Sequence, residues 1–208
     1  MPRIKHLRAI VAEEQMAAQS AKGLESLAAT VGKRRGPAPV HLWNPPYCGD
    51  LDIRIASEGT WYYLGTPIGR PALVRLFASV LKREGERYFL VTPVEKIGIR
   101  VDDAPFQAVE FELEGVGPNR SLVFRTNVDD IVRCDSDHTL RFEPETGTGG
   151  IKPYLHVRRD LWARVTRAVF LELVEIGEVR DIDGKRMFGV ASSGLFFPMA
   201  PESALAES

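Results

Sequence analysis

The sequence predicts an α+β protein built from two similar small modules, each combining an antiparallel sheet with a helix. Three observations lead to this fold class. Segments in which apolar and polar residues alternate, as they do in half-buried strands, occur in both halves of the chain. Each half also contains an apolar stretch with helical spacing that ends at a glycine. Finally, the order strand, helix, glycine, two strands is found around residues 71–101 and again around 154–191, which indicates a duplication.

The size and composition are those of an ordinary globular protein. The chain has 208 residues, of which 44% are hydrophobic and 26% are charged, and its formal net charge is -1. This charge gives no bulk electrostatic reason to bind DNA or an anionic membrane. Cys48 and Cys134 are too far apart in sequence to indicate a disulfide framework or a metal site. Because no apolar run could cross a bilayer and no signal peptide is evident, we expect a cytoplasmic protein without a membrane partner.

The first 39 residues are predicted to form an arm outside the folded body. Residues 4–19 have apolar side chains at helical spacing, and this segment is a candidate contact for a protein partner or for a second copy of the chain. Glycine, proline and the cations Lys33, Arg34 and Arg35 then indicate a linker. These three cations give the sequence its one direct indication of nucleic-acid contact, and the alternative is a solvated linker.

The N-terminal module is predicted to cover residues 40–105 and to begin with the densest mixture of aromatic, turn-forming and charged residues in the chain. Prolines open the segment 43–55, and strict alternation then places Asp50, Asp52 and Arg54 on one face of a strand. The leucine and isoleucines between them occupy the other face. A strand with two acids and one base on the same face is either solvated or lines a polar cleft.

The remaining elements follow from apolar spacing and turn residues. In the N-terminal module we expect strands over 61–64, 87–92 and 95–101, and a helix from Pro71 to Gly85. In the C-terminal module, residues 106–200, we expect strands over 109–114, 121–125, 129–133, 140–142, 154–157, 179–182 and 186–191. The helix of this module is predicted to be capped by Asp160 and to end at Gly177, and residues 201–208 form a tail.

Six segments carry distinctive combinations of prolines, aromatic residues and charges: Trp43–Arg54, Thr66–Ile68, Val91–Lys96, Ile99–Phe106, Arg125–Asn127 and Lys152–Arg158. Together they resemble the bacterial family called domain of unknown function 1285, over roughly residues 40–200. The resemblance implies a duplicated α+β body whose C-terminal half is similar to a pleckstrin-homology barrel. It also implies a pocket at the interface of the halves for a nucleotide-like ligand, and a role in signalling, but no catalytic activity. The similarity to pleckstrin-homology domains does not by itself imply phosphoinositide binding.

A polar ligand-binding site is predicted from charged and aromatic side chains that alternate out of these segments. Arginine side chains suit phosphate groups, carboxylates suit ribose hydroxyls or base edges, and aromatic rings can stack on a base. The candidates are Trp43, Tyr47, Asp50, Asp52, Arg54, Arg100, Asp102, Asp103, Phe106, Tyr154, His156 and Arg158. The alternative is a network of surface salt bridges that stabilises a contact between the modules.

No catalytic signature is recognisable in the sequence. The loop 146–150 with Lys152 resembles a phosphate-binding loop only superficially, because the Gly-Lys-Ser/Thr ending is missing and no helix follows. No spacing indicates metal ligands, no catalytic residue is assigned, and the identity of any cofactor stays open. We therefore expect a nucleotide-like anionic small molecule to bind between the modules, with a role in signal transduction rather than catalysis.

Two other functions remain open at this stage. The first is a protein-interaction adaptor that uses the N-terminal helix and the acidic strand 109–114 as its working surfaces. The second is a hydrolase that uses Asp50, Asp52 or Asp102, with or without a divalent ion, if these carboxylates converge in space.

Overall fold

The computed structural model describes residues 37–117, 120–145, 147 and 149–207. These residues form two compact units. The N-terminal unit comprises residues 62–100 together with the described residues up to Arg54, and the C-terminal unit comprises Ile55–Trp61 and the chain from Val101 onwards. The predicted helix over residues 4–19 and the basic linker lie outside the described residues. Within the described part of the chain, no helix is long and apolar enough to cross a membrane.

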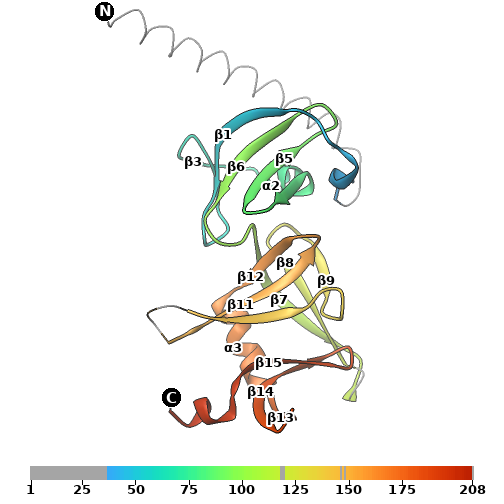
Figure 1. Cartoon of the computed structure of the whole chain (residues 1–208), viewed down its shortest axis with the longest axis vertical. Coiled ribbons are helices and arrows are strands. Elements are labelled where there is room, and N and C mark those ends of the chain that lie inside the picture. The colour runs from blue at the N-terminus through green and yellow to red at the C-terminus, as the bar shows by residue number, and fades with distance from the viewer. Residues whose placement is uncertain (1–36, 118–119, 146, 148, 208) are drawn as a thin grey trace, which may run out of the picture. The chain divides into compact units, whose positions relative to one another are not determined.

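The N-terminal unit is built around a six-stranded sheet with the strand order β3-β2-β1-β6-β5-β4 (Figure 1). Its elements are η1 (Val40–Leu42), β1 (Tyr47–Ile55), β2 (Trp61–Tyr63), β3 (Thr66–Pro67), α2 (Pro71–Ser79), β4 (Leu81–Glu84), β5 (Arg87–Val91) and β6 (Lys96–Val101). The strands bury Ile53, Leu90 and Ile97, and α2 adds Phe77 and Ala78 to the buried side chains. The expected hairpin, helix and pair of later strands are all present.

The helix of this unit is shorter than the predicted span of 71–85. It ends at Ser79, and Leu81–Glu84 forms strand β4, which pairs in antiparallel register with β5. The turn between β4 and β5 uses Gly85, whose φ of 61° suits glycine. The prediction failed because apolar Val80 and Leu81 continue the helical spacing, whereas Val80 is the C-cap of α2 and Leu81 is buried in extended backbone by its pairing with β5.

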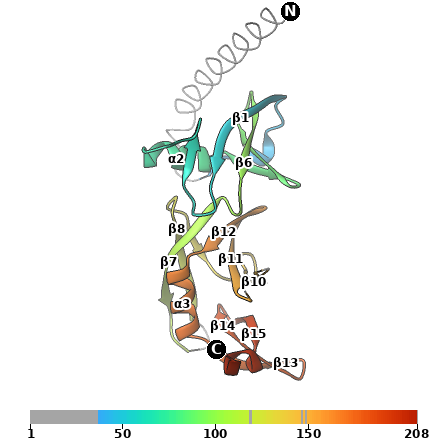
Figure 2. The same ribbon diagram turned by 90° about the vertical axis from the view of Figure 1, so that its left-hand side faces the viewer.

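The C-terminal unit contains a six-stranded sheet that curls into half a barrel, with the order β10-β11-β12-β7-β8-β9 (Figures 1 and 2). Its strands are β7 (Phe106–Glu114), β8 (Ser121–Thr126), β9 (Ile131–Arg133), β10 (Leu140–Pro144), β11 (Ile151–Arg158) and β12 (Leu161–Val165). The sheet pairs its strands antiparallel except that β12 lies parallel to β7. This parallel pairing is what brings the start of β7 beside the end of β12.

One helix and a smaller sheet complete the C-terminal unit (Figure 2). These elements are α3 (Arg167–Glu175), β13 (Glu178–Ile182), β14 (Lys185–Ser192), β15 (Leu195–Pro201) and η3 (Glu202–Glu207), with the sheet order β13-β14-β15. The predicted hairpin around Asp183-Gly184 is present as β13 and β14. The α+β fold class is confirmed, since the described residues of each half form a six-stranded sheet and an α-helix.

The helix of this unit also begins later than predicted. Residues 161–165 form strand β12, and α3 starts only at Arg167, with Thr166 as its N-cap. Within β12 the buried residues are Leu161, Ala163 and Val165, so the side chains alternate with a period of two. The spacing of Leu161, Val165 and Val169 fits a helix equally well, and pairing with β7 and β11 decides in favour of a strand.

Candidate functional site

A pocket of about 870 Å³ opens in the C-terminal unit. Its described lining residues are Ser57, Glu58, Asp102, Asp103, Gln107, Glu145, Gly150, Ile151, Lys152, Pro153, Arg164, Val165, Thr166, Arg167, Phe170 and Leu171. They come from the turn after β1, the segment before β7, the start of β11, the end of β12 and the first turns of α3. The volume lies within the range of about 300–1,000 Å³ that is usual for small-molecule sites.

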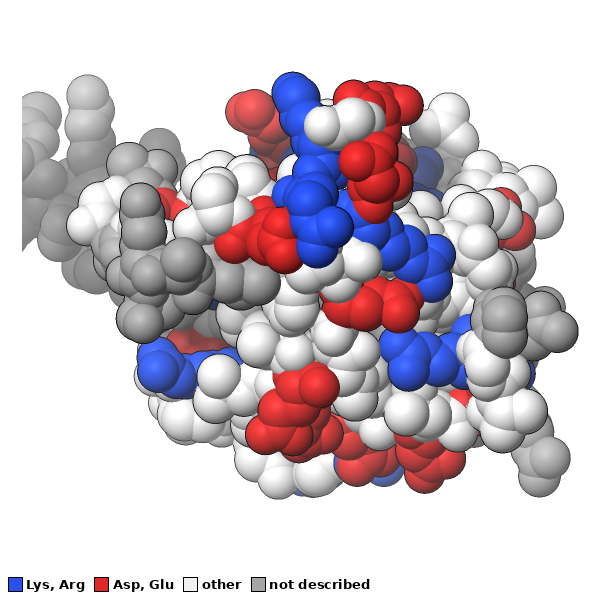
Figure 3. Space-filling view, turned by 90° about the horizontal axis from the view of Figure 1, so that it is seen from below, with Lys and Arg blue, Asp and Glu red and all other residues white. Residues whose placement is uncertain are grey.

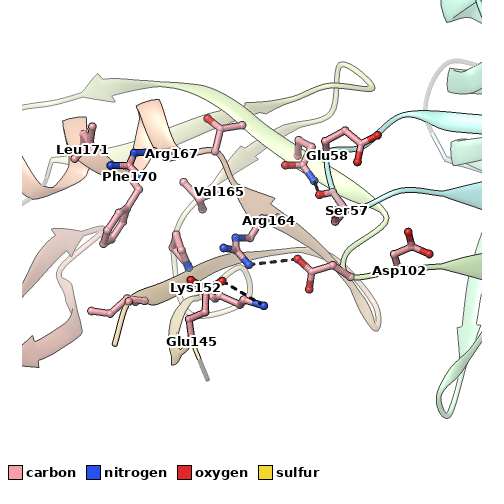
Figure 4. Close-up of a pocket in the computed structure, with 16 residues that line it drawn as sticks. Ser57, Glu58, Asp102, Glu145, Lys152, Arg164, Val165, Arg167, Phe170 and Leu171 are labelled. Atoms are coloured by element: carbon pink, nitrogen blue, oxygen red, sulfur yellow. Dashed lines mark hydrogen bonds and ion pairs between the residues drawn. The ribbon is translucent and has the colours of Figure 1, made fainter. Parts of the chain in front are cut away.

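The chemical character of the pocket changes from one end to the other. Figure 4 shows Arg167, Phe170 and Leu171 at one end and Glu58 and Asp102 at the other. Two further cations, Lys152 and Arg164, lie between these ends. A ligand that fills the pocket therefore meets a basic and apolar end, a centre in which cations are paired with carboxylates, and an acidic end.

The basic end is formed by the start of α3. Arg167 is the first residue of the helix, its side chain is exposed, and it has no ion-pair partner among the described residues. Thr166 makes no side-chain capping bond, and the first turn of α3 contains no acidic residue. Because the first N–H groups of a helix lack partners within the helix and carry a partial positive charge, this end of the pocket favours an anionic group.

The two central cations are each paired with a carboxylate. Lys152 Nζ lies 3.6 Å from Glu145 Oε1, and both side chains are about one-third exposed. Arg164 Nη1 lies 3.3 Å from Asp103 Oδ2, and both are less exposed, at 22% and 24%. Arg164 on β12 is directly paired with Tyr154 on β11, and Lys152 is two residues before Tyr154, so the two positive charges project from one face of the half-barrel.

Tyr154 links Asp103 and Arg164 at the floor of this cluster. Its hydroxyl donates to Asp103 Oδ1 at 2.6 Å and accepts from Arg164 Nη1 at 3.3 Å. Burial of the ring, together with the hydrogen bond to Asp103, raises the pKa of Tyr154 to about 12. The hydroxyl therefore stays protonated at neutral pH and acts as a hydrogen-bond donor rather than as a base.

The wall opposite these cations is fixed by a hydrogen-bonded turn. Gln107 Nε2 donates to the carbonyl of Ser57 at 3.0 Å, and the Gln107 backbone N–H donates to Asn127 Oδ1 at 3.0 Å. Gly59 packs directly on the Gln107 side chain, where a Cβ would lie only 2.6 Å from Cγ, and its φ is 87°. Only glycine suits that position, and the packing holds Ser57 and Glu58 at the rim.

The predicted site residues fall into different parts of the molecule. Of the twelve, Asp102 and Asp103 line the pocket, and Tyr154 contacts Asp103 beneath it. Six belong to the N-terminal unit: Trp43, Tyr47, Asp50, Asp52, Arg54 and Arg100. The other three belong to the C-terminal unit but do not line the pocket: Phe106, His156 and Arg158.

Within the N-terminal unit, Tyr47 and Asp50 on β1 both contact Arg87 on β5. The Arg87 guanidinium forms an ion pair with Asp50 Oδ1 at 2.7 Å and donates to the Tyr47 hydroxyl at 3.2 Å. These interactions raise the pKa of Arg87. On the neighbouring strand pair, the Arg54 guanidinium lies 5.9 Å from the centre of the Tyr62 ring. These side chains thus form cation–aromatic and ion-pair contacts across the sheet.

The three remaining predicted residues make contacts away from the pocket. Phe106 is completely buried, so its ring belongs to the core, with the Arg158 guanidinium 4.8 Å from the ring centre. Arg158 also forms an ion pair with Asp130. His156 packs against Trp162, with ring centres 5.0 Å apart, and its ring contacts the carbonyl of Asp137 at 2.6 Å.

Most of the pocket residues were not among the predicted site residues, including Glu58, Arg164, Arg167 and Phe170. The last three lay inside the segment predicted as one continuous helix, which gave no indication that they line a pocket. The alternation of buried Leu161, Ala163 and Val165 was the signal that placed Arg164 on the outer face of a strand. Lys152 had been noticed in the sequence, but only beside an incomplete phosphate-loop motif.

The structure also describes the acidic strand proposed for the adaptor function and the carboxylates that a divalent ion would need. On the acidic strand β7, Glu110 pairs with Arg125 and Glu114 pairs with Arg133, so much of its negative charge is compensated. On the face shown in Figure 3, acidic and basic side chains are likewise interspersed. Within the described residues, no group of three or more His, Cys, Asp or Glu side chains is placed to hold a metal ion.

Comparison with known proteins identifies the family. A model of the N-terminal domain of DUF1285, a domain of unknown function, matches residues 38–104, and a model of the C-terminal domain matches residues 105–199. The crystal structure of a DUF1285 family protein from Silicibacter pomeroyi DSS-3 is 50% identical to this chain, with a TM-score of 0.81. The similarity covers 88% of this chain and 97% of that one. The chain belongs to the DUF1285 family.

The two family models also agree with the arrangement of the sheets. Each of the two matched segments contains one complete six-stranded sheet, as expected for a body made of two α+β modules. A second DUF1285 family structure, from Shewanella baltica OS155, is 31% identical over 59% of this chain and 90% of that chain, with a TM-score of 0.47. Among curated proteins no match is found. Membership of DUF1285 thus establishes the family without assigning an activity.

Proposed function

We propose that this DUF1285 protein binds a nucleotide-like anionic small molecule in the pocket of its C-terminal unit and takes part in signal transduction. A nucleotide combines an anionic phosphate, a hydroxyl-bearing sugar and a flat base, and each of these needs a different surface. The proposal is that phosphate binds at Arg167 and Lys152, and that the hydroxyls or the base edge bind at Glu58 and Asp102. Phe170 then supplies the apolar surface for the base.

The observation that carries the proposal is Arg167 at the start of α3. Its guanidinium is exposed at the pocket, has no ion-pair partner within the described residues and stands beside backbone N–H groups that Thr166 leaves uncapped. Arginine presents several donors in a planar fork that matches phosphate oxygens. Lys152, on β11, adds a second cation, which pairs with Glu145 at the long distance of 3.6 Å.

The test is a thermal-shift screen of the full chain against nucleoside mono-, di- and triphosphates, cyclic nucleotides and dinucleotides, each with and without magnesium. A ligand at one hundred times its Kd adds about 2.7 kcal/mol to the free energy of unfolding, which is easily detected. The affinity of any nucleotide that shifts the transition is then measured by calorimetry for Arg167→Gln and Lys152→Gln.

We expect each of these substitutions to weaken nucleotide binding at least about tenfold, because each removes a charge-assisted hydrogen bond. Lys185→Gln is the matched control, since Lys185 is an exposed cation of the same unit on β14, outside the pocket. Loss of affinity in the two pocket variants and not in the control supports the proposal. A flat screen, or equal affinities in all three variants, rejects it.

A further inference from the structure

The carboxylate of Asp103 is held by two hydrogen-bond donors that converge on its two oxygens. Tyr154 donates its hydroxyl proton to Oδ1 at 2.6 Å, while Arg164 Nη1 lies 3.3 Å from Oδ2. Arg164 Nη1 also donates to the Tyr154 hydroxyl, so the three side chains form a closed arrangement. A hydroxyl and a guanidinium directed at the same carboxylate constitute a small anion-binding site, and here the chain fills that site with its own side chain.

The two donors are positioned independently of Asp103. Tyr154 on β11 and Arg164 on β12 are directly paired in the antiparallel register. The Arg164 guanidinium lies 5.2 Å from the centre of the Tyr154 ring, and the Arg141 guanidinium lies 5.1 Å from the same ring centre. Only 5% of Tyr154 is exposed. Strand pairing and cation–π contacts therefore keep both donors in place when their acceptor changes.

Of the three side chains, that of Asp103 is the least firmly fixed by secondary structure. It lies between β6 and β7, in a segment that forms neither helix nor strand. Its side chain remains 24% exposed and lines the pocket, as does that of Arg164. A partly exposed ion pair contributes little to stability, so an anion that enters the pocket can compete for Arg164.

We propose that Asp103 is an internal competitor: the anionic group of a bound ligand displaces its carboxylate and takes over the donors of Tyr154 and Arg164. This inference rests on the proposed function and adds a mechanism for regulation of the same pocket. Displacement releases the segment that joins β6 to β7. The same segment connects the two family-model domains, so ligand binding in the pocket changes how that connection is held.

The experiment compares the wild-type chain with Asp103→Asn, using calorimetry with inorganic phosphate and with the tightest-binding nucleotide of the screen. Asparagine keeps the shape of aspartate and an oxygen for the Tyr154 hydroxyl, but it removes the competing charge. We expect binding to become about fivefold tighter, the size of a partly exposed ion pair. Hydrogen exchange of residues 101–104 should increase when ligand is added to the wild type, and should already be high in Asp103→Asn.

Two control variants separate displacement from a general effect of charge. Glu58→Gln removes the same charge from the rim of the pocket, where Glu58 has no ion pair with Arg164 among the described contacts. Its affinity for inorganic phosphate, which lacks the hydroxyls and base edge proposed to bind at Glu58, should change less than that of Asp103→Asn. In an Arg164→Gln background, Asp103→Asn should bring no gain, because the shared donor is gone. Circular dichroism confirms that each variant is folded.

The outcomes distinguish this inference from the proposed function. Nucleotide binding by the wild type with an unchanged or weaker affinity in Asp103→Asn overturns the competitor role and leaves the proposed function standing. Equal gains in affinity for inorganic phosphate in Asp103→Asn and Glu58→Gln also overturn it, because they indicate only a change in overall charge. No binding by either the wild type or Asp103→Asn rejects the proposed function itself.

Discussion

Gly98 on β6 lies directly beneath the carboxylate of Asp50 on β1: a Cβ built on Gly98 would be only 1.8 Å from Asp50 Oδ1. The same Oδ1 accepts a hydrogen bond from Arg87 Nη2 at 2.7 Å, and that nitrogen would be 3.1 Å from the added Cβ. The backbone of Gly98 does not need a positive φ, so glycine is required here for space. The position of Asp50, a predicted ligand-binding residue, thus depends on the space left by Gly98 and on the hydrogen bond from Arg87.

The first prediction is that Gly98→Ala lowers the melting temperature because the added methyl group collides with the Asp50 carboxylate. Alanine forces the Asp50 side chain to rotate away and breaks its pair with Arg87. In an Asp50→Ala background the obstruction is gone, and alanine is then favoured over glycine in a strand by about 0.5–1 kcal/mol. A double-mutant cycle followed by thermal denaturation measures this coupling. Equal effects of Gly98→Ala in both backgrounds would contradict the steric explanation.

The second prediction concerns Leu64, which occupies a backbone conformation that leucine rarely adopts. Leu64 and Gly65 form the two-residue turn between β2 and β3, with φ values of 48° and 73°. Positive φ at both positions is the mark of a type I′ turn, where asparagine, aspartate and glycine are preferred. Leu64 is also 61% exposed, so its side chain gains little from packing.

Leu64→Asn should therefore raise the free energy of unfolding by about 1 kcal/mol, the usual size of such backbone strain. The turn between β13 and β14 provides the control, because Asp183 has a φ of 53° and precedes Gly184 in the same way. Asp183→Asn should be nearly neutral there, since both residues tolerate this conformation. Urea denaturation of the two variants decides the matter: a neutral or destabilising Leu64→Asn would mean that Leu64 makes a stabilising contact.

Local patterns in the sequence were sufficient to predict the fold class, several hairpins and the acidic face of β7. They were insufficient where one pattern fits two structures. In both units, the apolar spacing that extends the predicted helix beyond the bounds of the real one also fits a strand. Pairing with another strand decides between helix and strand, and the sequence pattern of the segment itself does not show that pairing. Arg164 lies on a strand and Arg167 at the start of a helix, and the two elements meet between them at the pocket.

Phe106 illustrates a second limit of sequence patterns. Alternation extended backwards from Glu110 and Glu112 places Phe106 on their exposed face. The register of β7 against β8 shifts between Ala108 and Glu110, however, and this β-bulge reverses the facing of the residues before it. Phe106 is consequently buried. The contact between Asp103 and Arg164 was equally inaccessible, because it depends on the parallel pairing of β7 with β12.

The third prediction is a dependence of stability on pH that arises from Glu84. Its carboxylate accepts from Lys82, 2.9 Å away, and from Lys96, 3.0 Å away, and these bonds lower the pKa of Glu84 below its ordinary 4.5. A carboxyl group with a lowered pKa in the folded state stabilises that state above pH 4.5 and loses this contribution as the pH falls through the folded-state value.

Glu84→Gln should thus lower the melting temperature at pH 7, and the difference from the wild type should shrink as the pH is lowered past 4.5. The effect is modest, because the Glu84 side chain is 36% exposed and solvent screens both pairs. Glu86→Gln, in the adjacent turn, is the control with no ion pair among the described residues and should leave the melting temperature unchanged. A difference for Glu84→Gln that stays constant between pH 7 and pH 3 would exclude the ion pairs as its cause.

The fourth prediction concerns Ser192, a fully buried hydroxyl that fastens the small sheet to the half-barrel. Ser192 Oγ donates to the carbonyl of Cys134 at 2.6 Å and accepts from the backbone N–H of Leu122 at 2.9 Å. Ser192→Ala leaves that N–H buried without its acceptor, which costs about 1–3 kcal/mol. Ser136→Ala, at an exposed position, is the control for the substitution itself.

Cys134 supplies a local readout of the same change. Its side chain is buried, and burial raises the pKa of the thiol to about 12, so a thiol reagent should label the exposed Cys48 quickly and Cys134 only after the structure opens. Because Ser192 binds the Cys134 carbonyl, Ser192→Ala should accelerate labelling of Cys134 and leave the rate at Cys48 unchanged. A destabilised variant in which Cys134 is labelled at the wild-type rate would show that the two sheets stay joined without this hydroxyl, and that the loss arises elsewhere.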